Sequence, residues 1–190
     1  MEAIDTISLS DTVVVIDPCY DMGTIGCGAV LENVLPGTWA CGVDYHDYWE
    51  GKPGRVGSLY GYHIDEPDID FSLDKLEWVA VCGVDSGQLG IFDNAYFAHS
   101  VEIDPKRNGN WYSEVCATTL TELLAGAKDE RCYVSSSGDG DGGYAIYVAR
   151  NDAGRIIGIR IPFILPAKKS DPDEEDDWDV DDYWNPEDDA

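Results

Sequence analysis

The chain has 190 residues, with 38 acidic and 12 basic side chains and a net charge of −26 at pH 7. This acidity argues against direct binding to a phosphate backbone, because nucleic-acid-binding proteins carry a basic surface. The sequence has no run of 18 apolar residues and no basic, apolar leader. We therefore expect no transmembrane helix, no signal peptide and a cytoplasmic location.

Short β-branched and apolar runs dominate the first half of the chain. Residues 12–16 are such a run, stopped by Asp17 and Pro18, which is typical of a buried strand followed by a turn. Residues 29–35 favour neither strand nor helix. Further strands are predicted at residues 38–45, 55–64, 78–84 and 89–93.

The second half adds one helix. Residues 102–112 have the composition of a loop, with Asp-Pro and Asn-Gly-Asn steps. A helix is predicted at residues 113–127, where Ser113 can cap it and three leucines share one face. These leucines are Leu120, Leu123 and Leu124.

A strand at residues 131–135 and a hairpin complete the predicted fold. The hairpin joins residues 144–150 to 155–163 through a turn that ends in Gly154. Together the elements predict a mainly β (α+β) protein: an antiparallel β-sandwich or open barrel with one or two short helices. We expect a single globular domain at residues 1–166 and an acidic tail at 167–190.

The tail concentrates charge. The last twenty residues hold twelve acids and no base, so they carry −12 and the remainder carries −14. A block of like charge predicts a disordered tail. Its aromatic residues are candidate anchors, either in a partner's groove or on the chain's own body. The predicted partner-binding residues are Asp173, Glu174, Glu175, Asp176, Asp177, Trp178, Tyr183 and Trp184.

The six cysteines are irregularly spaced and include no Cys-x-x-Cys pair. In a cytoplasmic chain this pattern is typical of reduced, mostly buried thiols rather than of a zinc site. The sequence also has no P-loop, no Gly-x-Gly-x-x-Gly motif and no Gly-x-Ser-x-Gly elbow.

A loop at residues 135–144 alternates glycine with Asp139 and Asp141. Several oxygens on a flexible loop are what Ca²⁺ or Mg²⁺ requires, and Asp17 and Asp85 are candidates to complete the set. The bidentate Glu of an EF-hand is missing. The alternative is a tight, solvated turn without any cofactor, in which Asp and Gly occupy their usual places.

A second polar cluster surrounds His46, which lies between Asp44 and Asp47 with Tyr48 beyond. A histidine among carboxylates is one arrangement that performs acid–base catalysis. The alternative interpretation is a surface turn. Both stay open at this point.

Several short motifs occur in a fixed order at residues 15–18, 34–39, 84–88, 136–144 and 159–163. In this the chain resembles the uncharacterised bacterial and phage proteins of domain-of-unknown-function family 4241. The resemblance implies a β-rich domain of phage or mobile-element origin and brings no established activity. The chain departs from the family pattern by an extra Asp-Gly step in the loop and by the acidic tail.

Two classes of function remain. The favoured one is a non-enzymatic, phage-encoded inhibitor that blocks the basic nucleic-acid-binding surface of a host defence nuclease, of anti-CRISPR or anti-restriction type. A bacterial immunity protein against a basic toxin would use the same electrostatics. The other class is a small metal-binding module or hydrolase-like enzyme centred on the Asp/Gly loop. The aromatic content also permits a homodimer.

Overall fold

A computed structural model describes residues 2–24 and 26–165, so the predicted tail and its partner-binding residues lie outside the described residues. The strands are β1 Glu2–Leu9, β2 Thr12–Ile16, β3 Gly28–Glu32, β4 Gly37–Tyr45, β5 Tyr48–Trp49, β6 Lys52–Pro53, β7 Val56–His63, β8 Glu77–Val84, β9 Gln88–Asp93, β10 Ala125–Lys128, β11 Cys132–Ser136, β12 Gly142–Arg150 and β13 Ile156–Pro162. The helices are α1 Asn94–Ile103, α2 Asn110–Thr119 and a 3₁₀ turn at Leu73–Lys75.

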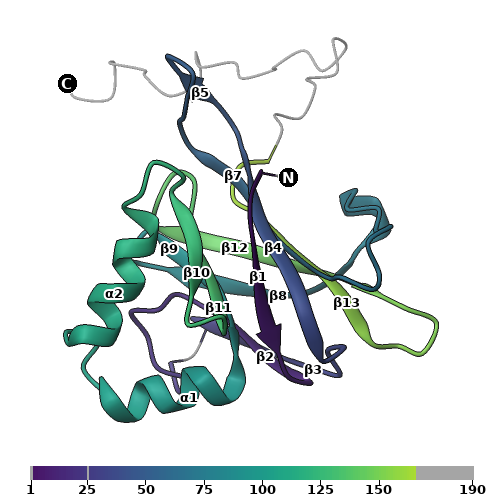
Figure 1. The fold of residues 1–190 in the computed structure, drawn as a ribbon, viewed down its shortest axis with the longest axis horizontal. Helices are drawn as coiled ribbons and strands as arrows, with labels where there is room; N and C mark the ends of the chain where they lie inside the picture. The colour runs from purple at the N-terminus through teal and green to yellow at the C-terminus, as the bar shows by residue number, and fades with distance from the viewer. Residues whose placement is uncertain (1, 25, 166–190) are drawn as a thin grey trace, which may run out of the picture.

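Two antiparallel sheets form a sandwich, which confirms the predicted fold class (Figure 1). The six-stranded sheet has the order β1-β4-β7-β13-β12-β8, and the five-stranded sheet has the order β10-β11-β9-β2-β3. Strands β5 and β6 form a separate small hairpin. The predicted hairpin of residues 144–163 is confirmed as β12 and β13.

The two sheets meet along two seams. At one, the Ser8 amide of β1 donates to the Glu130 carbonyl beside β10 over 2.7 Å. At the other, the Gly83 amide of β8 donates to the Gly26 carbonyl before β3 over 2.8 Å. These bonds satisfy backbone groups of edge strands and bring the sandwich close to an open barrel.

The position of strand β2 between two apolar clusters explains why its sequence is continuously apolar. Val13 and Val15 point into the core between the sheets, where Trp39 is fully buried. Val14 and Ile16 point to the opposite face, into a second cluster formed with α1 and α2. Figure 1 shows both helices on this side of the five-stranded sheet. Because both faces are covered, no polar alternation is needed.

The predicted helix at residues 113–127 is wrong in its position. Helix α2 begins at Asn110, where the Asp104 carboxylate accepts from the Asn108, Gly109 and Tyr112 amides, and it ends at Thr119. Its buried face is Trp111, Val115 and Thr119. The leucines that suggested a longer helix are not its apolar face.

Several elements were missed or left undecided in the sequence, among them the short strands β5, β6 and β10, the last of which begins inside the predicted helix. Strand β1 and helix α1 were not predicted, and residues 29–35 contain strand β3. Helix α1 is capped by Asp93, whose side chain accepts from the Tyr96 amide. None of the helices within residues 2–24 and 26–165 has the length and apolarity to span a membrane.

Candidate functional site

Asp17 is a buried carboxylate that fastens the end of β2 to the turn between β8 and β9. It accepts hydrogen bonds from the Asp85 and Ser86 amides over 2.9 and 2.8 Å and from the Ser86 hydroxyl over 2.6 Å. The Cys19 amide donates over 2.9 Å. Both carboxylate oxygens thus face hydrogen-bond donors of the chain, which stabilises a buried charge.

Asp85 lies next to this turn and contacts a different partner. The Tyr20 hydroxyl donates to its carboxylate, and this bond is the main reason that the pKa of Tyr20 is raised. The structure therefore places Asp17 and Asp85 next to each other, with their carboxylates in separate hydrogen bonds. The Asp17 carboxylate accepts from the backbone amide of Asp85, and the Asp85 carboxylate takes no part in this bond.

The cysteines around this corner are not activated thiols. Burial, followed by hydrogen bonding to Asp17, raises the pKa of Cys19, and burial raises the pKa of Cys82 to about 12. The thiolate is the nucleophilic form, so such thiols are poor nucleophiles at neutral pH. All six cysteines are free thiols in the structure; Cys41, Cys82 and Cys132 are buried and the other three are half-buried, so half of them rather than most are buried.

The Asp/Gly loop is a packed turn beside the same corner. The Ser137 amide donates to the Gly87 carbonyl over 3.0 Å. The Tyr144 hydroxyl lies 2.8 Å from the Ser137 carbonyl oxygen and 2.7 Å from that of Gly140. Gly138 has φ +67, and a Cβ there would lie 2.9 Å from the Cβ of Phe163. The positive φ and the close packing contact both favour glycine at this position.

Asp139 forms a brace with the neck of the β5–β6 hairpin. Its Oδ1 is 2.5 Å from Arg55 Nη1, and Arg55 Nη2 is 2.8 Å from Asp47 Oδ2. The Arg55 amide also donates to Asp47 over 2.6 Å. The pKa of Asp47 is lowered by these bonds from the Arg55 backbone and side chain. Asp47 is thus an ion-pair partner of Arg55.

The four predicted metal ligands do not form one donor set. Asp17 is saturated by backbone and hydroxyl donors, Asp85 accepts from Tyr20, and Asp139 pairs with Arg55. Within residues 2–24 and 26–165, no group of three or more His, Cys, Asp or Glu side chains has the arrangement of a metal site. Asp141 is exposed on the outer side of the turn. A Ca²⁺ or Mg²⁺ site therefore gains no support from this geometry.

His46 is exposed, and its amide donates to the Arg55 carbonyl over 2.7 Å. This bond pairs the two backbone segments that enter and leave the hairpin at its neck. The neighbouring Asp47 carboxylate is occupied by Arg55. The geometry matches the surface-turn interpretation of this cluster better than the acid–base one.

The connection between β7 and β8 carries the densest acidic cluster of the described chain. We call residues 64–76 the acidic segment; it contains five acids and one base. The acids are Asp65, Glu66, Asp68, Asp70 and Asp74, and the base is Lys75. All of the acids except the half-buried Glu66 are exposed.

Apolar side chains hold the acidic segment on the outer face of the six-stranded sheet. The rings of Phe71 and Tyr60 are 5.1 Å apart in an edge-to-face arrangement. Arg160 Nη1 donates to the Phe71 carbonyl over 2.6 Å, and its guanidinium lies over the Tyr60 ring. Gly158 of β13 leaves the space that Ile69 fills. The alternation of Asp68 and Asp70 with these anchors turns the carboxylates toward solvent.

Hydrogen bonds keep one of these carboxylates ionised. The Ser72 amide donates to Asp70 over 2.9 Å. Hydrogen bonds from the side chain and backbone of Ser72 lower the pKa of Asp70. This part of the surface therefore stays negative well below neutral pH.

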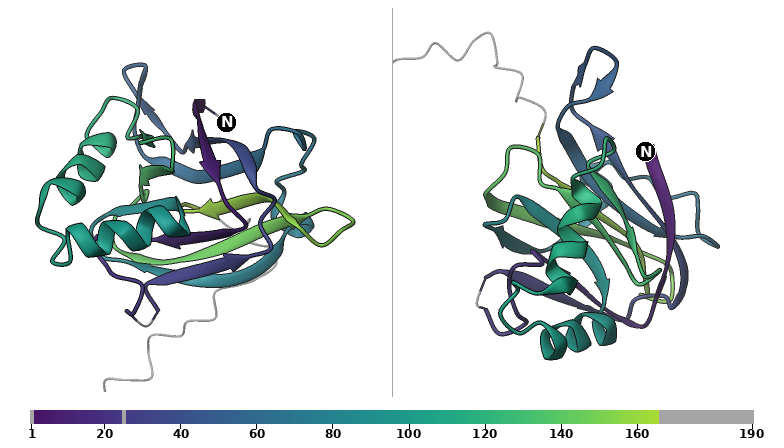
Figure 2. Two further views of the ribbon diagram at one scale, coloured as in Figure 1. Left: turned by 60° about the horizontal axis from the view of Figure 1, so that its bottom comes forward. Right: turned by 60° about the vertical axis from the view of Figure 1, so that its left-hand side comes forward.

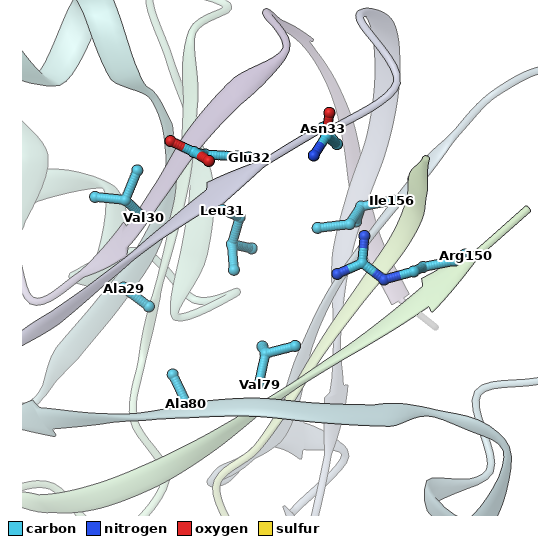
Figure 3. Close-up of a pocket in the computed structure, with 9 residues that line it drawn as sticks. All are labelled: Ala29, Val30, Leu31, Glu32, Asn33, Val79, Ala80, Arg150 and Ile156. Carbon is cyan, nitrogen blue, oxygen red and sulfur yellow. The ribbon is translucent and has the colours of Figure 1, made fainter. Parts of the chain in front are cut away.

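A groove of about 330 Å³ opens along the β3–β8 seam (Figure 3). It is lined by Ala29, Val30, Leu31, Glu32, Asn33, Val79, Ala80, Arg150 and Ile156. Most of these side chains are apolar. Arg150 is engaged, because it donates to Glu77 over 2.7 Å and to the Gly154 carbonyl over 3.0 Å. The groove contains no pair of nucleophile and base, so its lining does not indicate an enzyme.

No family model, curated protein or solved structure matches this chain. The resemblance to family 4241 therefore stays a prediction. Function has to be argued from the geometry of the chain itself. The acidic segment was not singled out in the sequence, although its Asp-Ile-Asp-Phe alternation between two strands was the available signal.

Proposed function

We propose that this chain is a non-enzymatic acidic binding protein that occupies a basic, nucleic-acid-binding surface of another protein. The proposed target is a host defence nuclease of the CRISPR or restriction type, and the proposed origin is a phage. The acidic segment carries the proposal: it is a row of exposed carboxylates held in place by Ile69 and Phe71. Fixed carboxylates of this kind stand in for the phosphates that the basic surface normally binds.

The contacts of the basic side chains within the chain support the proposal. Lys52, Arg55, Lys75, Lys128, Arg131 and Arg150 all form ion pairs with carboxylates. Arg107, Arg155 and Arg160 donate to backbone carbonyls. With 26 acids and 12 bases in residues 1–170, the remaining surface potential is strongly negative. Such a surface speeds association with a basic partner and makes it salt-sensitive.

The experiment is an inhibition assay on purified nucleases. The chain is added to DNA cleavage reactions of CRISPR and restriction nucleases, with a basic ribonuclease toxin as a separate arm that tests the immunity-protein alternative. The test variant combines Asp65→Asn, Asp68→Asn, Asp70→Asn and Asp74→Asn. The control removes four exposed charges elsewhere, by Asp11→Asn, Glu32→Gln, Glu102→Gln and Glu130→Gln.

We expect the test variant to inhibit its target at least about tenfold more weakly than the control, since exposed ion pairs contribute roughly 0.2–1 kcal/mol each. The apparent affinity of the unmodified chain should fall as salt rises. Equal inhibition by the two variants would show that the acidic segment is not part of the interface. An absence of inhibition in every nuclease arm would defeat the proposed target class.

A further inference from the structure

A second surface, away from the acidic segment, exposes large apolar side chains. Trp49 at the tip of the β5–β6 hairpin is 77% exposed and Tyr48 is 51% exposed. Leu120 and Leu123, in the turn after α2, are 83% and 49% exposed. We call these four residues the hairpin patch. Exposed apolar patches rimmed by polar residues mark interaction sites on soluble proteins.

Tertiary contacts place the hairpin and the turn side by side. The Tyr48 ring lies 5.7 Å from that of Tyr45, and the Tyr45 hydroxyl donates to the Leu123 carbonyl over 2.7 Å. Lys52, which pairs with Trp49 across the hairpin, is 3.4 Å from Glu122. Two segments about seventy residues apart in sequence thus expose apolar side chains from neighbouring positions.

The hairpin is held in one position at its neck. Arg55 joins Asp47 on the hairpin to Asp139 on the Asp/Gly loop. The Gly54 amide donates to the Asp47 carbonyl over 2.9 Å, and a Cβ on Gly54 would lie 2.1 Å from Asp47 Oδ1. Both views of Figure 2 show the hairpin projecting from the sheets. A braced projection that carries an exposed Trp is typical of a binding anchor, because Trp is enriched at interface hot spots.

The charges beside the patch identify the kind of partner. Four carboxylates, those of Asp47, Glu50, Glu122 and Asp139, lie on the hairpin, on the turn or at the brace. The bases here are Lys52 and Arg55, which pair with all of them except the exposed Glu50, so the surroundings of the patch stay negative. Residues 171–190 carry twelve acids and no base, so like charge opposes their docking on this surface. The same charge opposes an anionic lipid surface. The complementary partner is a protein surface with an apolar centre and a basic border.

We propose that the hairpin patch is a docking surface for a protein segment with an apolar face bordered by lysine or arginine. Trp49 is its anchor, and the Asp47–Arg55–Asp139 brace holds the anchor in its binding position. This surface is separate from the acidic segment, and it does not require that the target be a nuclease.

Two peptides of equal charge test the proposal by fluorescence anisotropy. One is an amphipathic helical peptide of Leu and Lys, and the other has every Leu replaced by Ser. The full chain should bind the Leu/Lys peptide at least about tenfold more tightly, a difference of about 1.4 kcal/mol. Trp49→Ala should remove this preference without changing the melting temperature, because the side chain is exposed.

Trp78→Ala is the matched control, since Trp78 is 58% exposed on edge strand β8 and outside the patch. It should keep the preference, and so should the four-residue Asn variant of the acidic segment. Asp139→Asn should weaken binding of the Leu/Lys peptide by loosening the brace. The proposal is overturned if the two peptides bind equally, if Trp49→Ala keeps the preference, or if Trp78→Ala removes it. Trp49-dependent binding to zwitterionic or anionic vesicles, without a peptide preference, would assign the patch to membranes instead.

Discussion

At the scale of single residues, the acidic side chains of this protein divide into structural and surface groups. Asp17 and Asp93 are fully buried and accept several hydrogen bonds each, so they fasten neighbouring elements together. Asp68 and Asp70 are exposed and face solvent from the acidic segment. A count of acids in the sequence cannot separate these groups, because burial depends on which strands become neighbours.

Replacement of Asp17 by Asn should lower the free energy of unfolding by about 2–4 kcal/mol. The amides of Asp85 and Ser86 would lose a charged acceptor in a buried place, and such bonds contribute roughly 1.5–3 kcal/mol each. Chemical denaturation measures the change. Asp141→Asn is the control and should stay within about 0.5 kcal/mol of the unmodified chain, because Asp141 is exposed. Equal stability of the two variants would show that Asp17 is not a fastening residue.

Asp93 should make the free energy of unfolding depend on pH in the acidic range. Burial raises the pKa of Asp93, but hydrogen bonds from Ser10 and Arg131 outweigh burial and lower it below the ordinary value of 3.8. A lowered pKa in the folded state stabilises the protein above the unfolded pKa, and this stabilisation is lost as the pH falls through the folded pKa. Asp93→Asn should therefore be less stable at pH 7 and should lose less stability between pH 7 and acid below about pH 4. Parallel pH–stability curves for the two proteins would contradict this.

At the scale of elements, the sequence predicted those strands and turns that depend on contacts between residues close together in the chain. Strand β2 and the hairpin of β12 and β13 were predicted, because β-branched runs and a Gly-terminated turn act over a few residues. The helix at residues 113–127 was misplaced because its start depends on Asp104, six residues before Asn110. Helix α2 ends at Thr119, and the last residues of the predicted helix instead belong to a turn, in which Leu124 adopts φ +54, and to β10, where Ala125 pairs with Ser135.

The candidate surfaces were harder to predict than the strands for the same reason. Asp139 was singled out for its glycine-rich loop, yet its partner Arg55 is 84 residues away in sequence. The turn that carries Leu120 and Leu123 meets the β5–β6 hairpin only through tertiary contacts such as that of Tyr45 with Leu123. Sequence spacing contains no information on such contacts unless the strand order is known.

The acidic segment should depend on a glycine that it covers. A Cβ at Gly158 would lie 2.8 Å from Ile69 Cδ1 and 3.3 Å from Phe71 Cε1, so Gly158→Ala must displace the segment or its anchors. We expect a loss of about 1–2 kcal/mol in stability and faster amide hydrogen exchange at residues 64–76. Gly143→Ala is the control, because its nearest neighbour is Val81 Cγ1 at 3.4 Å, an ordinary contact. Unchanged exchange in Gly158→Ala would mean that the segment is not anchored through Ile69 and Phe71.

At the scale of the whole molecule, the two sheets of the β-sandwich are joined by backbone hydrogen bonds along two seams. Ion pairs with carboxylates engage six of the ten basic side chains in the described residues, and many of the other acids lie in connections between strands. The net charge of −26 is a cost to the compact state, since like charges repel. A core clustered around Trp39 and a second core under α1 and α2 offset this repulsion.

Competition between this chain and DNA for one nuclease tests the central claim most directly. A labelled DNA is bound to a nuclease that the chain inhibits, and the chain is then titrated in at several salt concentrations. Mimicry of phosphates predicts complete displacement of the DNA, no ternary complex, and a weaker apparent affinity of the chain as salt rises. A stable complex that holds the nuclease, the DNA and this chain together would contradict the account.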